Sequence, residues 1–172
     1  MNRSIALFLV SFCLLTVDAN AKDKPSPYED IYPQTGYKSV EEALDDFEQH
    51  LNQKIKLPLR VPPISFTHHF GRFSDSKYED NDAFEVKYIN DQSPENHYKI
   101  DIRKYKVPIR EKYVLSTFEL KNGIIATYIT IAGFNVLVFE RGDLQYMLSI
   151  DQRVSDKVTP EILVDIANSI DY

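Results

Sequence analysis

Apolar and polar side chains alternate with a period of two along most of the chain after residue 64, and this feature constrains the fold more than any other. Neighbouring side chains on a β-strand point to opposite faces, so the alternation predicts strands with one covered and one wet side. We expect strands at residues 64–70, 84–88, 98–102, 113–120, 124–131, 135–140 and 144–151. Asn122-Gly123 is typical of a type I′ turn, which needs positive φ at both central positions, and Gly133 and Gly142-Asp143 mark the next two turns. The last four strands are therefore predicted to form a meander.

Two helices are expected at the ends of this β region. Residues 39–42, Ser-Val-Glu-Glu, match a capping box, and apolar residues at helical spacing follow to about Gln53. Thr159 precedes Pro160, a residue favoured at the first position of a helix, and an apolar stripe continues to Ile170. We therefore expect an α+β fold, in which a mostly antiparallel sheet of about six or seven strands has the N- and C-terminal helices packed on one face.

The first residues resemble an export signal. Arg3 precedes an apolar run, Ile5 to Val17, that is too short to span a bilayer comfortably, and Ala19-Asn20-Ala21 follows with small residues where a signal peptidase needs them. We expect residues 1–21 to be removed, the proline-rich residues 22–37 to form an extended leader, and residues 38–172 to form a single domain without a stable membrane span. The alternative is an uncleaved N-terminal anchor.

The cysteine content and the net charge limit the cellular locations and the classes of partner that are compatible with this sequence. Cys13 is the single cysteine, and Phe12 precedes it where a lipid-anchoring site needs a small residue, so the mature chain would hold no thiol. The net charge of −6 argues against nucleic acid and anionic lipid as partners, because both require a basic face. The expected location is secreted or extracytoplasmic, associated with the cell envelope.

Residue patterns that carry catalysis are absent from the sequence. There is no GxSxG, HExxH or P-loop pattern, so neither a catalytic residue nor a cofactor is predicted. His68 and His69 are adjacent, and two imidazoles can ligate a metal or transfer protons, but neighbours on a strand face opposite sides. They are the candidates for an alternative reading, a secreted hydrolase or metal-dependent enzyme, and a metal would also need His50 or His97 close by.

Clustered carboxylates after the first strand are the other candidate site, because calcium binds oxygen ligands of this kind. The residues are Asp75, Glu79, Asp80, Asp82 and Glu85. The glycine that makes the sharp turn of an EF-hand is missing, so a solvated acidic loop is favoured and a cation site is the alternative. Arg141-Gly142-Asp143 spells a tripeptide that some cell-surface receptors read, but a hairpin turn requires such residues anyway.

The order of features from Tyr113 to Ile170 resembles a known family. The matching pieces are Leu120-Lys121-Asn122-Gly123-Ile124 with Ala126-Thr127-Tyr128, Leu137-Val138-Phe139-Glu140, Leu144-Gln145-Tyr146-Met147-Leu148, and the helix from Glu161 to Ile170. They are similar to a domain-of-unknown-function family at the C-termini of secreted, lipid-anchored and membrane-tethered regulatory proteins of Bacillus-type Gram-positive bacteria, in which tryptophan often replaces Phe139. The resemblance covers about a third of the chain and implies a small sheet-and-helix domain at the envelope with a sensing or binding role. No catalytic residue is implied, since none is established for the family.

These observations together favour an exported, non-enzymatic binding or accessory module. Its partner would be an envelope protein, a peptide or a wall polymer, contacted through the exposed sheet face or a sheet edge. The alternatives are the enzyme described above and a structural protein of the wall or spore.

Overall fold

The computed structural model describes residues 27–75 and 82–171, and the predicted signal peptide, residues 1–21, lies outside them. The helices are α1 (Pro27–Gln34), α2 (Val40–Leu51) and α3 (Pro160–Ala167), with short 3-10 turns η2 (Glu111–Tyr113), η3 (Gln152–Val154) and η4 (Asn168–Asp171). The strands are β1 (His68–Ser74), β2 (Ala83–Ile89), β3 (Tyr98–Arg103), β4 (Val114–Glu119), β5 (Ile125–Ile131), β6 (Phe134–Arg141) and β7 (Leu144–Asp151). No helix in these two ranges has the length and apolar character needed to cross a membrane.

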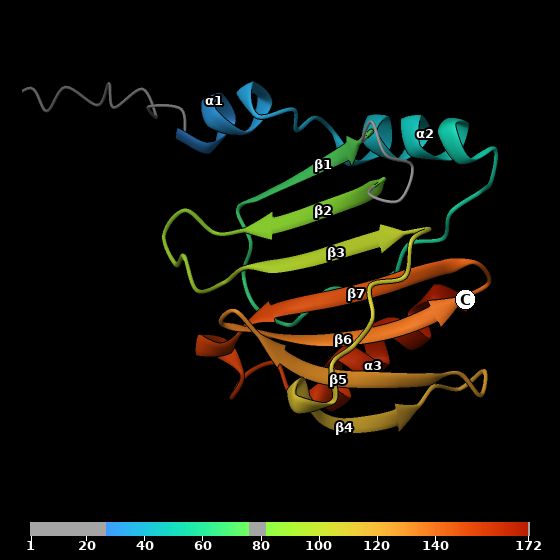
Figure 1. Cartoon of the computed structure of the whole chain (residues 1–172). Coiled ribbons are helices and arrows are strands. Elements are labelled where there is room, and N and C mark those ends of the chain that lie inside the picture. The colour runs from blue at the N-terminus through green and yellow to red at the C-terminus, as the bar shows by residue number, and fades with distance from the viewer. Residues whose placement is uncertain (1–26, 76–81, 172) are drawn as a thin grey trace, which may run out of the picture.

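All seven strands belong to one antiparallel sheet in the order β1-β2-β3-β7-β6-β5-β4 (Figure 1), which confirms the predicted mostly antiparallel α+β fold. The sheet consists of two meanders, β1 to β3 and β4 to β7. Residues 104–113 cross in front of β7, β6 and β5 to reach β4, so that β3 pairs with the last strand of the second meander. The first strand begins at His68 and not at Ile64 as predicted, because Ile64 and Phe66 pack against the core from the connector that precedes it.

The turn at Asn122-Gly123 differs from the predicted type I′ turn. Only Gly123 has positive φ, 80°, and two backbone hydrogen bonds close a three-residue loop between Leu120 and Ile124. The Asn122 side chain accepts a bond from the Ile124 amide at 3.1 Å, which holds the turn in this other geometry. A two-residue turn with positive φ at both positions occurs instead at Ala132-Gly133, with 51° and 83°.

Both predicted helix starts are present in the structure. Ser39 precedes α2, and its hydroxyl accepts a hydrogen bond from the Glu42 amide at 3.1 Å, as in a capping box. Pro160 is the first residue of α3 after Thr159, whose side chain makes no capping bond. The proline therefore marks the helix start without help from the preceding hydroxyl, because its ring restricts φ to the helical value.

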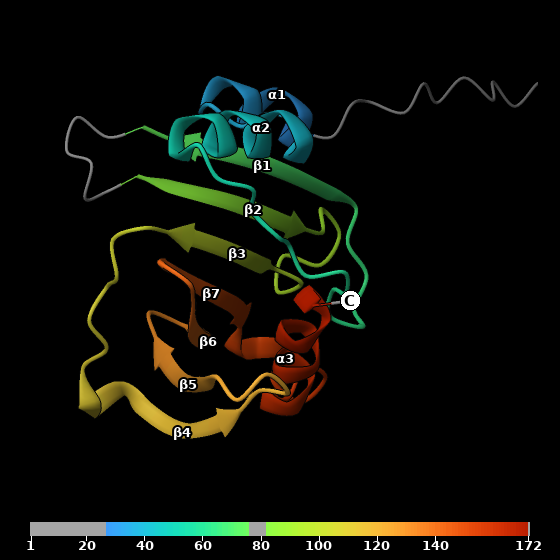
Figure 2. The same cartoon turned by 90° about the vertical axis from the view of Figure 1, so that its right-hand side faces the viewer.

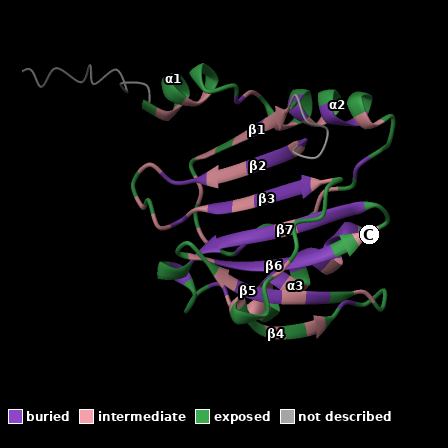
Figure 3. Cartoon of the chain, in the orientation of Figure 1, coloured by how far each residue is buried: buried purple, intermediate pink, exposed green. Residues whose placement is uncertain are grey.

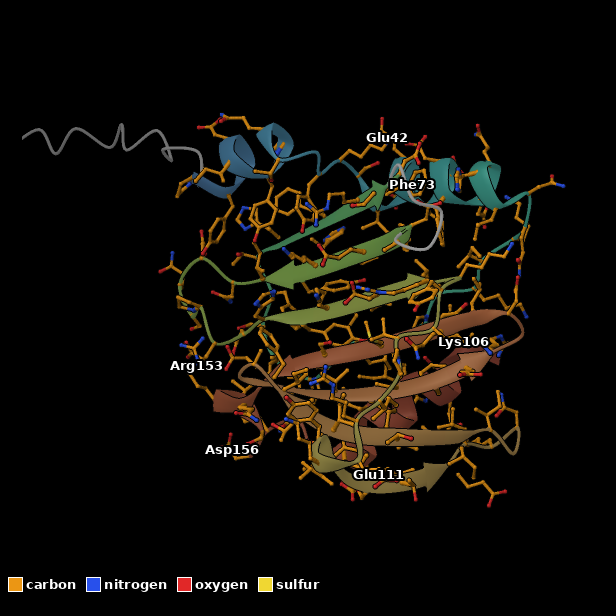
Figure 4. All side chains as sticks on the ribbon, viewed as in Figure 1. Glu42, Phe73, Lys106, Glu111, Arg153 and Asp156 are labelled. Atoms are coloured by element: carbon orange, nitrogen blue, oxygen red, sulfur yellow. The ribbon has the colours of Figure 1, made fainter. Side chains whose placement is uncertain are left out.

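Helix α2 packs closely against β1 and β2. Phe47 is fully buried, with its ring centroid 5.5 Å from that of Phe73 and 5.8 Å from that of Phe84. Gly71 allows the close approach, since a Cβ at this position would lie 2.8 Å from the Cα of Val40. Figure 3 shows the buried residues concentrated in the middle strands, and Figure 4 shows Phe73 beneath α2.

Helix α1 replaces part of the predicted extended leader. Pro27 begins it, where the missing amide has no partner to lose, and Pro33 lies in its last turn. The helix has no buried residue, but the Tyr32 ring stacks on Phe70 of β1 with centroids 4.7 Å apart. The prediction treated prolines as helix breakers, and it left open whether the tyrosines of this segment lie on the domain, because that docking is a tertiary contact.

The crossover covers one part of the sheet that alternation predicts to be wet. The Val107 amide donates to the Gln145 side chain at 3.0 Å, and that side chain donates back to the Val107 carbonyl at 3.1 Å. Beneath the crossover is a small second core, made of Ile129, Val136 and Val138 with Ile109, Tyr113, Phe134 and Met147 packed against it. Gln145 is consequently buried, and the prediction that one side of β7 is solvent-facing was wrong. Figure 2 shows the crossover and α3 on opposite sides of the sheet.

Candidate functional site

The two adjacent histidines do not form a shared site. His68 packs beside Phe70, with its Nδ1 2.7 Å from the Thr67 hydroxyl and its Nε2 3.9 Å from a Glu29 carboxylate oxygen. His69 is exposed and lies over the Tyr88 ring, with centroids 5.8 Å apart. The strand places the two imidazoles on opposite faces, and neither belongs to a cluster of three or more metal-ligating side chains in the described residues.

His97 also remains apart from them. It is half-buried directly before β3, in an edge-to-face arrangement with Phe134 in which the ring centroids are 5.3 Å apart. Burial and the nearby charges of Lys87 and Lys99 lower the pKa of His97, so its imidazole is held in the neutral form. It packs in the protein and does not approach His68 or His69 as a third ligand.

Two of the predicted acidic residues do converge, and a histidine joins them. His50 in the last turn of α2, Asp75 after β1 and Asp82 before β2 place one ligand atom each within 4.8 Å of one another. The Nε2 atom of His50 is 2.7 Å from a carboxylate oxygen of Asp82. The other two loop candidates, Glu79 and Asp80, lie outside the described residues.

Glu85 takes no part in this cluster, contrary to the prediction that grouped it with the loop. Its carboxylate accepts a hydrogen bond from the Tyr37 hydroxyl and lies 3.2 Å from Lys99 Nζ, 3.5 Å from Lys87 Nζ and 3.4 Å from an Arg72 guanidinium nitrogen. Alternation on β2 places this side chain on the face opposite to the buried Phe84 and Val86, where it belongs to an ion-pair network. A carboxylate with four such partners has little capacity left for a cation.

Two carboxylates in this network, those of Glu85 and Asp101, are shared among several cations of β1, β2 and β3. Burial alone would raise the pKa of Glu85, but the bond from Tyr37 and the charges of Lys99 and Lys87 outweigh it and lower the pKa. Burial and the bond to Glu85 raise the pKa of the Tyr37 hydroxyl far above its ordinary value. Lys99 also bridges to Asp101 at 3.0 Å. The network therefore holds β1, β2 and β3 together.

One edge of the sheet is capped by another part of the chain, and the other edge is open. On β1, Lys38 and Gly71 exchange two backbone hydrogen bonds of 2.8 and 2.9 Å, so a piece of the chain before α2 caps that edge. Strand β4 is the other edge, and within the described residues it pairs only with β5. Its sequence VLSTFE contains no proline and no lysine, residues that commonly protect an edge, although a register shift interrupts pairing at Leu115. The regular stretch Ser116–Glu119 therefore offers main-chain groups to another strand.

Exposed apolar side chains accompany this open edge. They are Val114 (37% exposed), Leu115 (58%), Ile125 (59%) and Ile131 (43%), all on β4 or on its neighbour β5. A hollow of about 290 Å³ adjoins Ile125, and Ile109 of the crossover and Val138 are among its other lining residues. Lys106 of the crossover, labelled in Figure 4, pairs with Glu140 at the rim of this hollow. This corner of the sheet has the free backbone groups and the apolar surface that strand addition requires.

Sequence reasoning missed the part that His50 plays and the open state of β4. His50 was considered only as a possible third ligand for the histidine pair, because nothing local relates the end of a helix to a hairpin 25 residues later. Strand β4 was recognised, but alternation does not reveal which strand ends a sheet.

Comparison with protein-family profiles, with curated proteins and with solved structures finds no significant match for this chain.

Proposed function

We propose that this protein is an exported binding module of the cell envelope, without enzymatic activity, that takes an extended segment of another envelope protein as an additional strand on β4. The observation that carries this proposal is the open β4 edge with exposed Val114 and Leu115, in a sheet whose other edge is capped. Main-chain hydrogen bonds would supply affinity, and alternate side chains of the bound segment would supply selectivity.

The proposed arrangement of layers supports this use of the edge. We infer that α2 and α3 cover the same face, because the register connects Phe84 under α2 with Tyr146 on β7 through Ile102. Gln145, the next residue, faces the other way and binds the crossover, and Figure 2 shows α3 on the side away from the crossover. With α2 and α3 over one face, and α1 and the crossover over parts of the other, β4 is the part of the sheet left open to a partner.

A peptide partner agrees with the chemistry better than a wall polymer. Glycan sites rely on exposed aromatic rings, and the chain has no tryptophan while many of its tyrosines and phenylalanines lie in the core.

The edge can be tested by site-specific photo-crosslinking in the cells that make the protein. A crosslinking side chain replaces Leu115 in one variant and Leu59, which is 71% exposed in the connector after α2, in a matched control. We expect one partner to be captured at position 115 and none at 59, with the captured peptide mapping to a single extended segment. Leu115→Lys should abolish binding of that partner, because a charged side chain disfavours edge pairing.

Amide exchange in the purified complex gives a second readout. We expect exchange of the β4 amides, residues 114–119, to slow when the partner is bound, while amides of β1 remain unchanged. Equal exchange of β4 with and without the partner would overturn strand addition. If crosslinks form only between two copies of this chain, the β4 edge pairs with itself and the proposed envelope partner is wrong.

Export is tested separately by the mass of the native protein. We expect a chain that begins at Lys22. Recovery of an intact Met1, or of an acylated Cys13, would refute a cleavable signal.

A further inference from the structure

We propose that His50, Asp75 and Asp82 form a binding site for a divalent transition-metal ion, for which Zn²⁺ is a suitable probe. The three ligand atoms already lie within 4.8 Å of one another, although they come from the end of α2 and from the two ends of the β1–β2 connection. Ligand atoms around a tetrahedral Zn²⁺ are about 3.4 Å apart, given metal–ligand distances near 2.1 Å. The His50–Asp82 contact of 2.7 Å would open slightly and the exposed Asp75 would move inward, so small side-chain rotations suffice.

The charge balance of the cluster favours a cation. Asp82 is only 4% exposed, yet Asp75 brings a second carboxylate close to it. Asp75 makes no hydrogen bond and no ion pair with other described residues. Like charges at this separation repel, and a divalent ion between them would remove the repulsion.

Contacts within the protein fix the orientation of the His50 side chain. Its ring packs against Phe73 of β1 with centroids 5.0 Å apart, and its Nε2 atom points to Asp82. A ligand held by packing loses less freedom when the ion binds, which is how surrounding side chains assist metal sites. Phe47, buried beside the same Phe73, ties this end of α2 to the sheet.

The ligand types select the kind of ion. One imidazole nitrogen with two carboxylate oxygens suits Zn²⁺ and its neighbours, whereas calcium prefers a shell made entirely of oxygen. The sequence alone suggested calcium because it showed only the carboxylates; the nitrogen ligand arrives through the tertiary structure. Three protein ligands leave one position for water, and the ion would fasten the end of α2 to the hairpin.

The test is a Zn²⁺ titration of the metal-free mature chain, residues 22–172, by calorimetry. We expect one ion per chain, with affinity reduced at least about tenfold in His50→Ala and in Asp75→Asn, since loss of a first ligand weakens a site by that order or more. Both substituted residues are exposed, so the variants should fold. His69→Ala is the matched control, because His69 is exposed on β1 and does not belong to the cluster.

Three outcomes would overturn the site. They are no saturable Zn²⁺ binding by the wild type, unchanged affinity in both His50→Ala and Asp75→Asn, and loss of binding in His69→Ala in place of those two. Ca²⁺ that binds as tightly as Zn²⁺ would overturn the assignment to a transition metal. The thermal midpoint supplies an independent readout, since bound Zn²⁺ should raise it in wild type and His69→Ala but not in His50→Ala.

Discussion

Replacing Gly71 with alanine tests the packing on which the first meander depends. A Cβ at this position would lie 2.8 Å from the Cα of Val40, 2.9 Å from the carbonyl oxygen of Ser39 and 2.9 Å from the Cβ of Ala43. Two of these three atoms belong to the backbone at the start of α2, so no side-chain rotation can relieve the contact. Carbon atoms pack best near 3.5–4.0 Å, and the start of the helix would have to move by roughly 1 Å.

The expected loss of stability follows from that displacement. Overpacking a close contact costs about 1–3 kcal/mol. The displacement would also strain the two backbone hydrogen bonds between Lys38 and Gly71, each worth about 1 kcal/mol. We therefore expect Gly71→Ala to lower the free energy of unfolding by about 3 kcal/mol, a large part of the about 5–15 kcal/mol that holds an ordinary domain.

Urea unfolding followed by circular dichroism measures this loss, and Gly123→Ala is the control. Gly123 has φ of 80°, and a Cβ there would meet nothing within 4 Å, so alanine costs only the left-handed backbone strain of about 1 kcal/mol. The close approach of α2 predicts that Gly71→Ala is the more destabilising of the two. A Gly71→Ala protein that is as stable as wild type, or more stable than Gly123→Ala, would refute the reasoning.

Three further substitutions test the core and the ion-pair network by the same unfolding assay. Phe47→Ala should cost about 3–5 kcal/mol, because it empties a fully buried site between Phe73 and Phe84; a cost under about 1 kcal/mol would place Phe47 outside the core. Tyr98→Phe should raise stability by about 1 kcal/mol, since the buried hydroxyl has no hydrogen-bond partner among the described residues, and a loss would reveal a partner. Glu85→Gln should be less stable than wild type at pH 7, and the difference should shrink as the pH falls below the ordinary carboxyl value of 4.5. The pKa of Glu85 is lowered in the folded state, so its stabilisation is present above the ordinary carboxyl value and is lost as the pH falls through the lowered one; a constant difference from about pH 7 to about pH 3 would contradict this.

Several parts of the fold follow from local sequence alone. Ser39 and Pro160 mark the starts of α2 and α3, because a side-chain oxygen can satisfy a free amide three residues along the chain and a proline ring restricts φ to the helical value. Alternation places β2, β3, β5, β6 and β7 almost to the residue, because the pleat of a strand imposes its period on every side chain in it.

Other parts were decided by contacts between distant residues. Pro27 and Pro33 suggested an extended leader, yet residues 27–34 form a helix that stacks Tyr32 on Phe70 of β1. Gln145 had the pattern of a wet position and is buried, since the crossover binds its amide. Local periodicity reports the geometry of one element, and it contains no information on what covers that element.

The candidate sites were likewise predicted in part from the sequence and decided in part by the tertiary structure. The sequence alone identified Asp75 and Asp82 as possible ligands, because oxygen-bearing side chains cluster between two predicted strands. Only the tertiary structure brought His50 to them, removed Glu85 into the network with Lys99, and left β4 at an open edge. The type and spacing of possible ligands can be read from a few neighbouring positions in the sequence. Which elements lie beside the end of a helix, and in what order the strands pair, depends on which surfaces can be buried together.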